Sequence, residues 1–206
     1  MQDRLNQRGI KYLLHFTKYS NLPGIMANGL VRRSELDSRG LEYAFNDDMR
    51  LDGHPNSLSV SIGFPNYRMF YPARNKYPDD TWVILALRPS VLIKKPCAFY
   101  PMNAATGCYK GIDPASLQTV EALDAMFGNV NGVERNTLNI PDNFTTDPQA
   151  EVLVFADIEP LYIGGIATQN KAQEQEVRQA YPHFGDDNVK YFPSLFSWRK
   201  DYQHWQ

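Results

Sequence analysis

Short apolar segments separated by polar loops dominate the chain. Residues 58–62 alternate apolar and polar side chains, which predicts a strand with one buried face. Residues 82–87 are apolar throughout, which predicts a central strand covered on both faces. Further strands are expected at 12–16, 149–155, 162–166 and 189–192.

Helical spacing occurs in three places between these strands. Leu22, Ile25 and Met26 follow a Ser-Asn pair that could cap a helix, and Asn28-Gly29 would end it. Longer helices are expected at 114–127 and 169–181. Strands interspersed with short helices predict an α+β fold around a β core.

Two long segments, 32–56 and 129–148, lack a regular period. The first alternates charged and small polar residues and has room for one short helix. The second contains five asparagines. Loops of this length in a compact domain are more often functional or mobile than idle.

Composition places the chain among globular proteins. It has 206 residues, 43% of them hydrophobic and 21% charged, so we expect one domain covering residues 1–206. The net charge of −2 excludes a polycation but still allows a local basic surface that binds nucleic acid.

Several protein classes are not expected. No apolar run is long enough to span a membrane, and the first residues lack a secretory signal, so we expect a cytoplasmic protein. Cys97 and Cys108 cannot form a zinc site alone, and we expect neither a metal nor a disulfide. The common Gly-rich nucleotide motifs and the Gly-x-Ser-x-Gly hydrolase motif do not occur.

Glu151 is the most informative single residue. Its carboxylate comes near the start of an otherwise apolar strand, directly after a polar loop. Burial of an unpaired charge there would cost several kcal/mol. The residue is therefore either a solvent-facing strand end or an acid or base at the mouth of a cleft, with Gln149 on the same face.

His15 and Thr17 lie on one face of the first expected strand. A histidine in this position is ordinarily a core residue bonded to a backbone carbonyl. Arg50, in the first long loop, is by itself an ordinary solvated charge.

Aromatic and basic residues alternate from Tyr67 to Tyr77, and a Ser-Trp-Arg-Lys sequence at 197–200 adds a second such cluster. Rings that stack on bases and cations that meet phosphates suit single-stranded nucleic acid. The alternative is an edge strand with ordinary surface arginines.

Taken in order, these motifs resemble a known family. His15-Phe16-Thr17, with Asn21-Leu22-x-Gly24-Ile25 and Gly29-Leu30 after it, resembles the opening of ADP-ribosyltransferase domains. The block 67–71 and Gln149-Ala150-Glu151 resemble later parts of the same domains. Over residues 12–192 the order and spacing are most similar to the DarT toxins, which ADP-ribosylate bases in single-stranded DNA.

The resemblance implies an α+β ADP-ribosyltransferase-like split β-core with short helices and long functional loops, in which NAD, the co-substrate, binds in a cleft between two sheets. It implies catalytic roles for Glu151 and for Arg50, which would hold the cofactor phosphates, with Arg33 and Arg39 as alternatives. The implied cofactor-binding residues are His15, Thr17, Asn21, Gly24, Arg50 and Gln149. The expected DNA contacts are Tyr67, Arg68, Tyr71, Arg74 and Arg199, with Lys76 beside them, and the loop 129–148 would present the target nucleotide.

The resemblance also implies an acceptor base and a partner. Residues 59–64 depart from the thymine-directed branch and favour guanine. A toxin of this type implies an antitoxin whose macrodomain removes ADP-ribose from DNA. The alternatives are transfer to RNA or protein, NAD hydrolysis, and a non-catalytic nucleotide-binding module.

Overall fold

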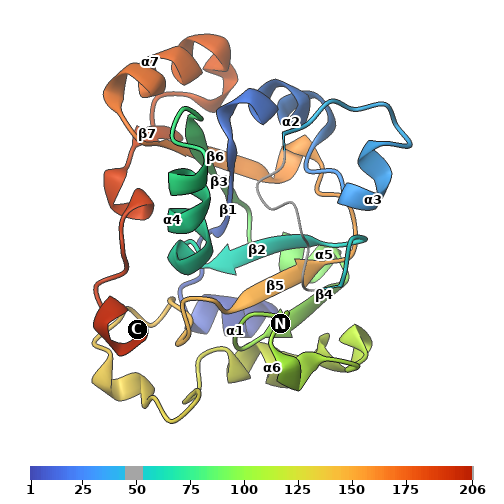
Figure 1. Ribbon diagram of the computed structural model, residues 1–206, viewed down its shortest axis with the longest axis vertical. Helices are drawn as coiled ribbons and strands as arrows, with labels where there is room; N and C mark the ends of the chain where they lie inside the picture. Colours follow the sequence, from blue (N-terminus) through green and yellow to red (C-terminus); the bar gives the residue numbers. More distant parts are fainter. Residues whose placement is uncertain (45–52, 206) are drawn as a thin grey trace.

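The computed structural model describes residues 1–44 and 53–205. Seven strands form one sheet in the order β4-β5-β2-β1-β3-β6-β7, and the paired neighbours are antiparallel except for β6 and β7 (Figure 1). The strands are β1 Leu13–Lys18, β2 Leu58–Ile62, β3 Trp82–Leu87, β4 Cys97–Tyr100, β5 Glu151–Val154, β6 Ile163–Thr168 and β7 Val189–Tyr191.

The sheet divides between β1 and β2. These two strands pair only at Leu13–Ile62 and Leu14–Ser61, whereas β1 pairs with β3 along its whole length. In Figure 1, β2, β4 and β5 consequently run across the view while β1 and β3 run along it. The expected α+β fold with a split β-core is confirmed.

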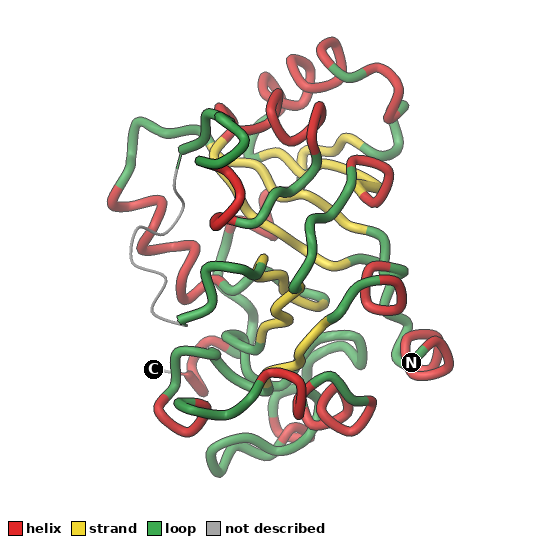
Figure 2. The backbone as a smooth tube through the Cα atoms, turned by 90° about the vertical axis from the view of Figure 1, so that its right-hand side faces the viewer, coloured by secondary structure: helices red, strands yellow, loops and turns green. Residues whose placement is uncertain are grey.

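The helices surround this sheet. They are α1 Gln2–Gln7, α2 Leu22–Asn28, α3 Arg33–Leu36, α4 Tyr67–Lys76, α5 Val91–Lys94, α6 Val120–Ala125 and α7 Lys171–Ala180. Figure 1 shows α4 against the β1–β3–β6 half, α7 beside β7, and α1 with α6 at the opposite end. Loops make up much of that opposite end (Figure 2).

Two local expectations were wrong, and one strand was not expected. The aromatic–basic segment forms α4, not an edge strand, because Tyr67 and Phe70 bury one helical face and the Asn66 side chain caps the first turn. The helix expected at 114–127 divides at Thr119, whose side chain caps α6. Strand β4 was not expected, because a continuous apolar run of only four residues does not distinguish a strand from another buried segment.

Core packing fixes the elements that border the cleft. Phe16 of β1 stacks on Phe70 of α4 with ring centroids 4.5 Å apart. Gly29, with φ of 82°, ends α2 where a Cβ would collide with the carbonyl of Ile158, and Leu30 pairs with Ile158. The first turn of α4 and the end of α2 are therefore held beside the divided sheet.

The cysteines and the helix lengths bear on the class of protein expected from the sequence. Both cysteines are free, Cys97 buried and Cys108 exposed, and burial raises the pKa of the Cys97 thiol to about 12. Within the described ranges, no helix combines the length and apolar character needed to cross a bilayer.

Candidate active site

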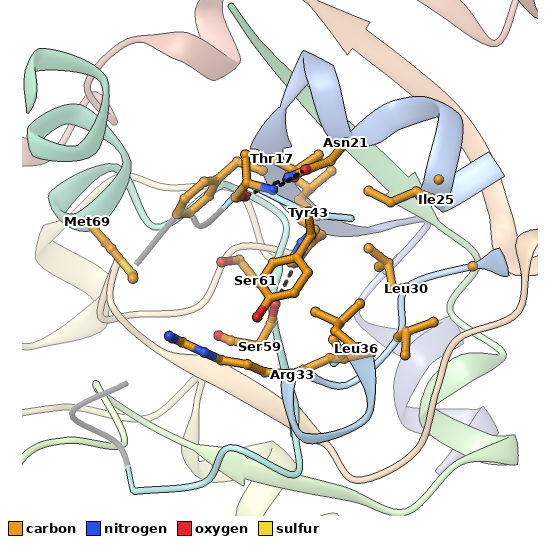
Figure 3. A pocket seen from close by; sticks show the side chains of 18 of the residues that line it. Thr17, Asn21, Ile25, Leu30, Arg33, Leu36, Tyr43, Ser59, Ser61 and Met69 are labelled. Atoms are coloured by element: carbon orange, nitrogen blue, oxygen red, sulfur yellow. Dashed lines mark hydrogen bonds between the residues drawn. The ribbon is translucent and has the colours of Figure 1, made fainter. Parts of the chain in front are cut away.

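The widening between β1 and β2 forms a cavity of about 760 Å³. This volume lies within the range of about 300–1,000 Å³ typical of small-molecule sites. Its lining comes from β1, β2, α2, α3, the first turn of α4, the segment after β4 and the start of β5. In Figure 3, Ser59 and Ser61 of β2 lie between Met69 of α4 on the left and Leu30 on the right.

Glu151 lies in this cavity as the first residue of β5, and its side chain is only 8% exposed. One carboxylate oxygen accepts a hydrogen bond of 2.5 Å from the Ser59 hydroxyl, and the other accepts one of 2.7 Å from the Ala104 amide. These donors offset part of the cost of burying the charge. The solvent-facing alternative for Glu151 is therefore excluded.

His15 bridges the divided strands. Its Nδ1 lies 2.9 Å from the carbonyl oxygen of Ser59, at the point where the β1–β2 ladder has stopped. A carbonyl can only accept, so Nδ1 carries the proton in this contact. The ring thus makes the carbonyl bond of an ordinary core histidine and lines the cavity as well.

Asn21 shapes the cavity wall through its own hydrogen bonds. Its amide nitrogen donates to Thr17 Oγ1 at 3.0 Å and to the carbonyl of Ala44 at 2.8 Å, while its oxygen accepts from the Ala44 amide at 2.7 Å. The side chain does not cap α2, contrary to expectation. In Figure 3 the Asn21 side chain lies beside Thr17 at the top of the view, and its bonds to Ala44 hold residues 41–44 in the cavity wall.

The remaining expected cofactor residues border the same space. Gly24 and Gln149 line the cavity, and a Cβ on Gly24 would come within 4.0 Å of the Glu42 carbonyl. Thr17 is buried and accepts from Asn21, so it contributes to the wall chiefly through that bond.

The arginines expected to bind phosphate or DNA near the cavity differ in where they lie. Arg50 lies outside the described residues. Arg33 of α3 lines the cavity, and Figure 3 shows its side chain extending toward Ser59. Arg68 of α4 also lines it and donates to the carbonyl of Trp205, whereas Arg39 pairs with Asp157 at 2.6 Å.

Sequence reasoning did not identify the two donors to Glu151. The Ala104 amide belongs to the backbone, so its side chain gives no signal. In the sequence, Ser59 is one polar position of an alternating strand. The pattern does not indicate that its hydroxyl faces a carboxylate on β5.

Two of the expected DNA contacts are buried, and a third is partly buried. Tyr67 is 3% exposed, and burial raises the pKa of its hydroxyl to about 12. Arg74 stacks on Phe70 and donates to the carbonyl of Phe196 at 2.6 Å. Arg199 is 2% exposed, so neither Tyr67 nor Arg199 offers an open ring face or a free cation to DNA, whereas Arg74 is only partly buried.

Arg199 instead joins the C-terminal segment to the chain that enters β5. Its guanidinium makes two bonds of 2.6 Å to Asp201 and further bonds to the carbonyls of Thr145, at 2.8 Å, and Thr146, at 2.5 Å. The Trp205 indole also donates to Asp201 at 2.8 Å. This buried network supports the turn that precedes Gln149 and Glu151.

Asp147 in that turn is buried away from solvent. Burial raises the pKa of its carboxyl, while the amide of Gln149, which donates to it at 2.7 Å, and the charge of Arg199 act in the opposite direction. The local chain before β5 is thus fixed by backbone contacts inside a low-dielectric environment.

An ion pair outside the cavity predicts a pH dependence. Burial acts to raise the pKa of Asp157, but hydrogen bonds from the backbone and side chain of Arg32 and from Arg39 outweigh it and lower the pKa below 3.8. A lowered folded pKa stabilises the fold above the unfolded value, and this stabilisation is lost as the pH falls through the folded pKa.

We therefore expect the free energy of unfolding to fall as the pH is lowered below about 3.8, with Asp157→Asn flattening part of that decline. Denaturant titrations across this pH range measure both curves. An equal pH slope in the two proteins would contradict the role of this ion pair.

Comparisons with known proteins match this architecture. The family model described as "ssDNA thymidine ADP-ribosyltransferase, DarT" matches residues 14–198. Thermosipho africanus DarTG in complex with ADP-ribose superposes with a TM-score of 0.61 at 15% identity, covering 90% of this chain and 51% of that chain. The chain thus spans about half the length of the Thermosipho protein.

Thermus sp. 2.9 DarT is similar along nearly its whole length. Its complex with carba-NAD+ gives a TM-score of 0.54 at 14% identity, covering 91% of this chain and 98% of that chain. Its complex with ADP-ribosylated ssDNA gives 0.56 at 12% identity, covering 92% and 97%. No curated protein matches the chain.

The structural likeness, at these identities, shows a shared fold. The family match confirms the resemblance found in the sequence and the enzyme class, a glycosyltransferase that transfers ADP-ribose. It names thymidine as the acceptor nucleoside, where the sequence had favoured guanine. Because that match extends over residues 14–198, which include both sides of the divided sheet and Glu151, the chain belongs to the DarT family of single-stranded DNA thymidine ADP-ribosyltransferases.

Proposed function

We propose that this cavity binds NAD and that the protein transfers ADP-ribose from NAD to a base of single-stranded DNA. The observation that carries the proposal is Glu151, a carboxylate 8% exposed and held by two donors inside a cavity large enough for a dinucleotide. The complexes of Thermus DarT with NAD+ and with ADP-ribosylated ssDNA support it.

The cavity offers suitable groups for such a substrate. Arg33 would meet phosphate oxygens of NAD, and His15, Gln149 and Glu151 would meet ribose or amide groups. Asn21, Thr17 and Gly24 would shape the wall against which the cofactor lies. We also retain Arg50 as a phosphate-binding and catalytic residue, on the family resemblance alone.

NAD supplies an ADP-ribosyl group attached to nicotinamide, which leaves with the bonding electron pair. Glu151 would stabilise the positive charge that develops on the ribose, and the low dielectric around it strengthens that interaction. As a new bond forms between the ribose and a base nitrogen, the carboxylate would orient the base or accept its proton. Ser59 and the Ala104 amide keep both carboxylate oxygens in position.

We propose thymidine as the acceptor, because the family match supports it, and guanine as the alternative that residues 59–64 favour. Tyr71 and Arg68 are exposed beside the cavity and would contact the DNA, and the loop 129–148 would present the acceptor nucleotide. Within that loop, Arg135 donates to the carbonyls of Phe144, at 2.8 Å, and Pro141, at 3.1 Å.

The biological role follows from the same proposal. We propose that the protein is the cytoplasmic toxin of a toxin–antitoxin pair, in one domain built on the single sheet, with a macrodomain antitoxin as its partner. The structure of Thermosipho africanus DarTG in complex with ADP-ribose supports this context.

Labelled NAD and four homopolymer oligonucleotides test the activity. We expect label on DNA of one base identity, and a mass-resolved nuclease digest then assigns the base. Free ADP-ribose alone would indicate an NAD hydrolase, label on RNA or on protein would indicate another acceptor, and the lack of nicotinamide release would indicate a binding module.

A further inference from the structure

Three exposed aromatic rings form a continuous surface beside the cavity. Trp198 lies 5.0 Å from Tyr71 of α4 and 5.5 Å from Tyr202, measured between ring centroids. Their exposed fractions are 47%, 39% and 37% for Trp198, Tyr71 and Tyr202. We call these three residues the aromatic platform.

Buried neighbours hold the platform in place. Arg199, Asp201 and Trp205 alternate with the exposed rings along the C-terminal segment and anchor it through their mutual hydrogen bonds. Buried Tyr67 packs under Trp198 with centroids 5.7 Å apart. The rings are therefore ordered before any ligand arrives, which lowers the entropic cost of binding.

The charge around the platform is positive. Arg68 and Lys200 are exposed, and α4 contains no acidic residue. Asp201, the carboxylate of the C-terminal segment 193–205, is buried against Arg199. A chain with a net charge of −2 thus places a local basic surface around its exposed rings.

The first turn of α4 connects the platform with the cavity. Arg68 and Met69 line the cavity, while Tyr67 and Tyr71 of the same helix contact Trp198. Figure 3 shows Met69 at the cavity side of this helix. A strand that leaves the cavity past Arg68 meets the platform next.

We propose that the platform stacks the bases of single-stranded DNA next to the acceptor nucleotide, with Arg68 and Lys200 meeting their phosphates. This inference rests on the proposed function of the cavity. Exposed aromatic rings flanked by cations are the combination that binds unpaired bases without sequence preference. A protein partner on the same surface is the competing outcome.

Steady-state kinetics with oligonucleotides of two lengths tests the inference. Trp198→Ala should raise KM for a long acceptor oligonucleotide about 5- to 150-fold, the range for loss of one base–aromatic stack. KM for the shortest acceptor and kcat with saturating DNA should change little. Tyr12→Ala is the matched control, because Tyr12 is also 47% exposed but lies outside the platform.

Tryptophan fluorescence tests binding without turnover. Trp82 and Trp205 are buried, so base stacking should quench mainly Trp198, and Trp198→Phe should remove the quench. Lys200→Gln should reduce the salt slope of oligonucleotide affinity by about 0.7, the value for one phosphate contact on a single strand.

The outcomes separate this inference from the proposed function. Quenching without transfer to any base would support the platform and contradict the activity proposed for the cavity. Transfer with no quench, and with equal KM values for Trp198→Ala and wild type, would overturn the platform alone. A platform that a protein partner covers while oligonucleotides leave its fluorescence unchanged would also overturn it.

Discussion

Glu151→Gln should lower kcat for ADP-ribose transfer by at least about 100-fold, because a positioned acid or base typically contributes about 10²–10⁴ in rate. Glutamine keeps the size of the side chain, and its carbonyl oxygen can still accept from the Ala104 amide. The Ser59 hydroxyl can rotate to accept from the new amide group. The variant therefore removes the negative charge while the surrounding geometry is retained.

Nicotinamide release and label transfer to an oligonucleotide measure this effect, and calorimetric titration with NAD measures binding separately. We expect NAD affinity to change far less than kcat. Ser59→Ala provides a graded comparison, because it removes one hydrogen bond to the carboxylate, worth about 1.5–3 kcal/mol, and keeps the charge. Glu151→Gln at near wild-type rate would remove Glu151 from the mechanism.

Arg199→Met should lower the free energy of unfolding by about 3–5 kcal/mol, the usual cost of leaving one partner of a buried ion pair alone. Asp201 would remain as a buried carboxylate, and the carbonyls of Thr145 and Thr146 would lose their donor. Such a loss is a large share of a typical stability of about 5–15 kcal/mol. Denaturant titration of the purified protein measures it.

A second substitution distinguishes the contribution of the ion pair to the free energy of unfolding from the contribution of side-chain packing. In Arg199→Met with Asp201→Leu, no buried charge is left alone, so the double variant should lose less stability than the sum of the two single variants. The Trp205 indole would still lose its acceptor, at a cost of about 1–3 kcal/mol. Surface substitutions usually change the free energy of unfolding by about ±0.5 kcal/mol. If the free energy of unfolding of the single variant Arg199→Met stayed within about 1 kcal/mol of the wild-type value, the network would not stabilise the fold.

The sequence predicted elements wherever one pattern dominated. Residues 58–62 alternate and residues 82–87 are continuously apolar, and both ranges coincide with strands β2 and β3. In α4 two signals conflicted: Tyr67, Phe70 and Ala73 have helical spacing, but Pro72 and the interleaved cations obscure it. The helix forms because Phe70 packs against β1 and the exposed Pro72 removes only one backbone donor.

The candidate site could be predicted only in part, and for a definable reason. Glu151 stood out because a charge inside an apolar strand needs an explanation. Arg199 could not be distinguished from a surface arginine, since its burial depends on two carbonyls more than fifty residues away, at Thr145 and Thr146. The Ala104 amide gave no signal, because every residue other than proline has one.

The short β1–β2 ladder also bears on solubility. A strand edge that is released from its neighbour is normally a place where chains aggregate, and proteins protect such edges with charges, bulges or coverings. Here the released edges lie inside the sheet, because β1 remains paired with β3 and β2 with β5. The fold thus leaves these strand edges facing the cavity without displaying them to another copy of the chain.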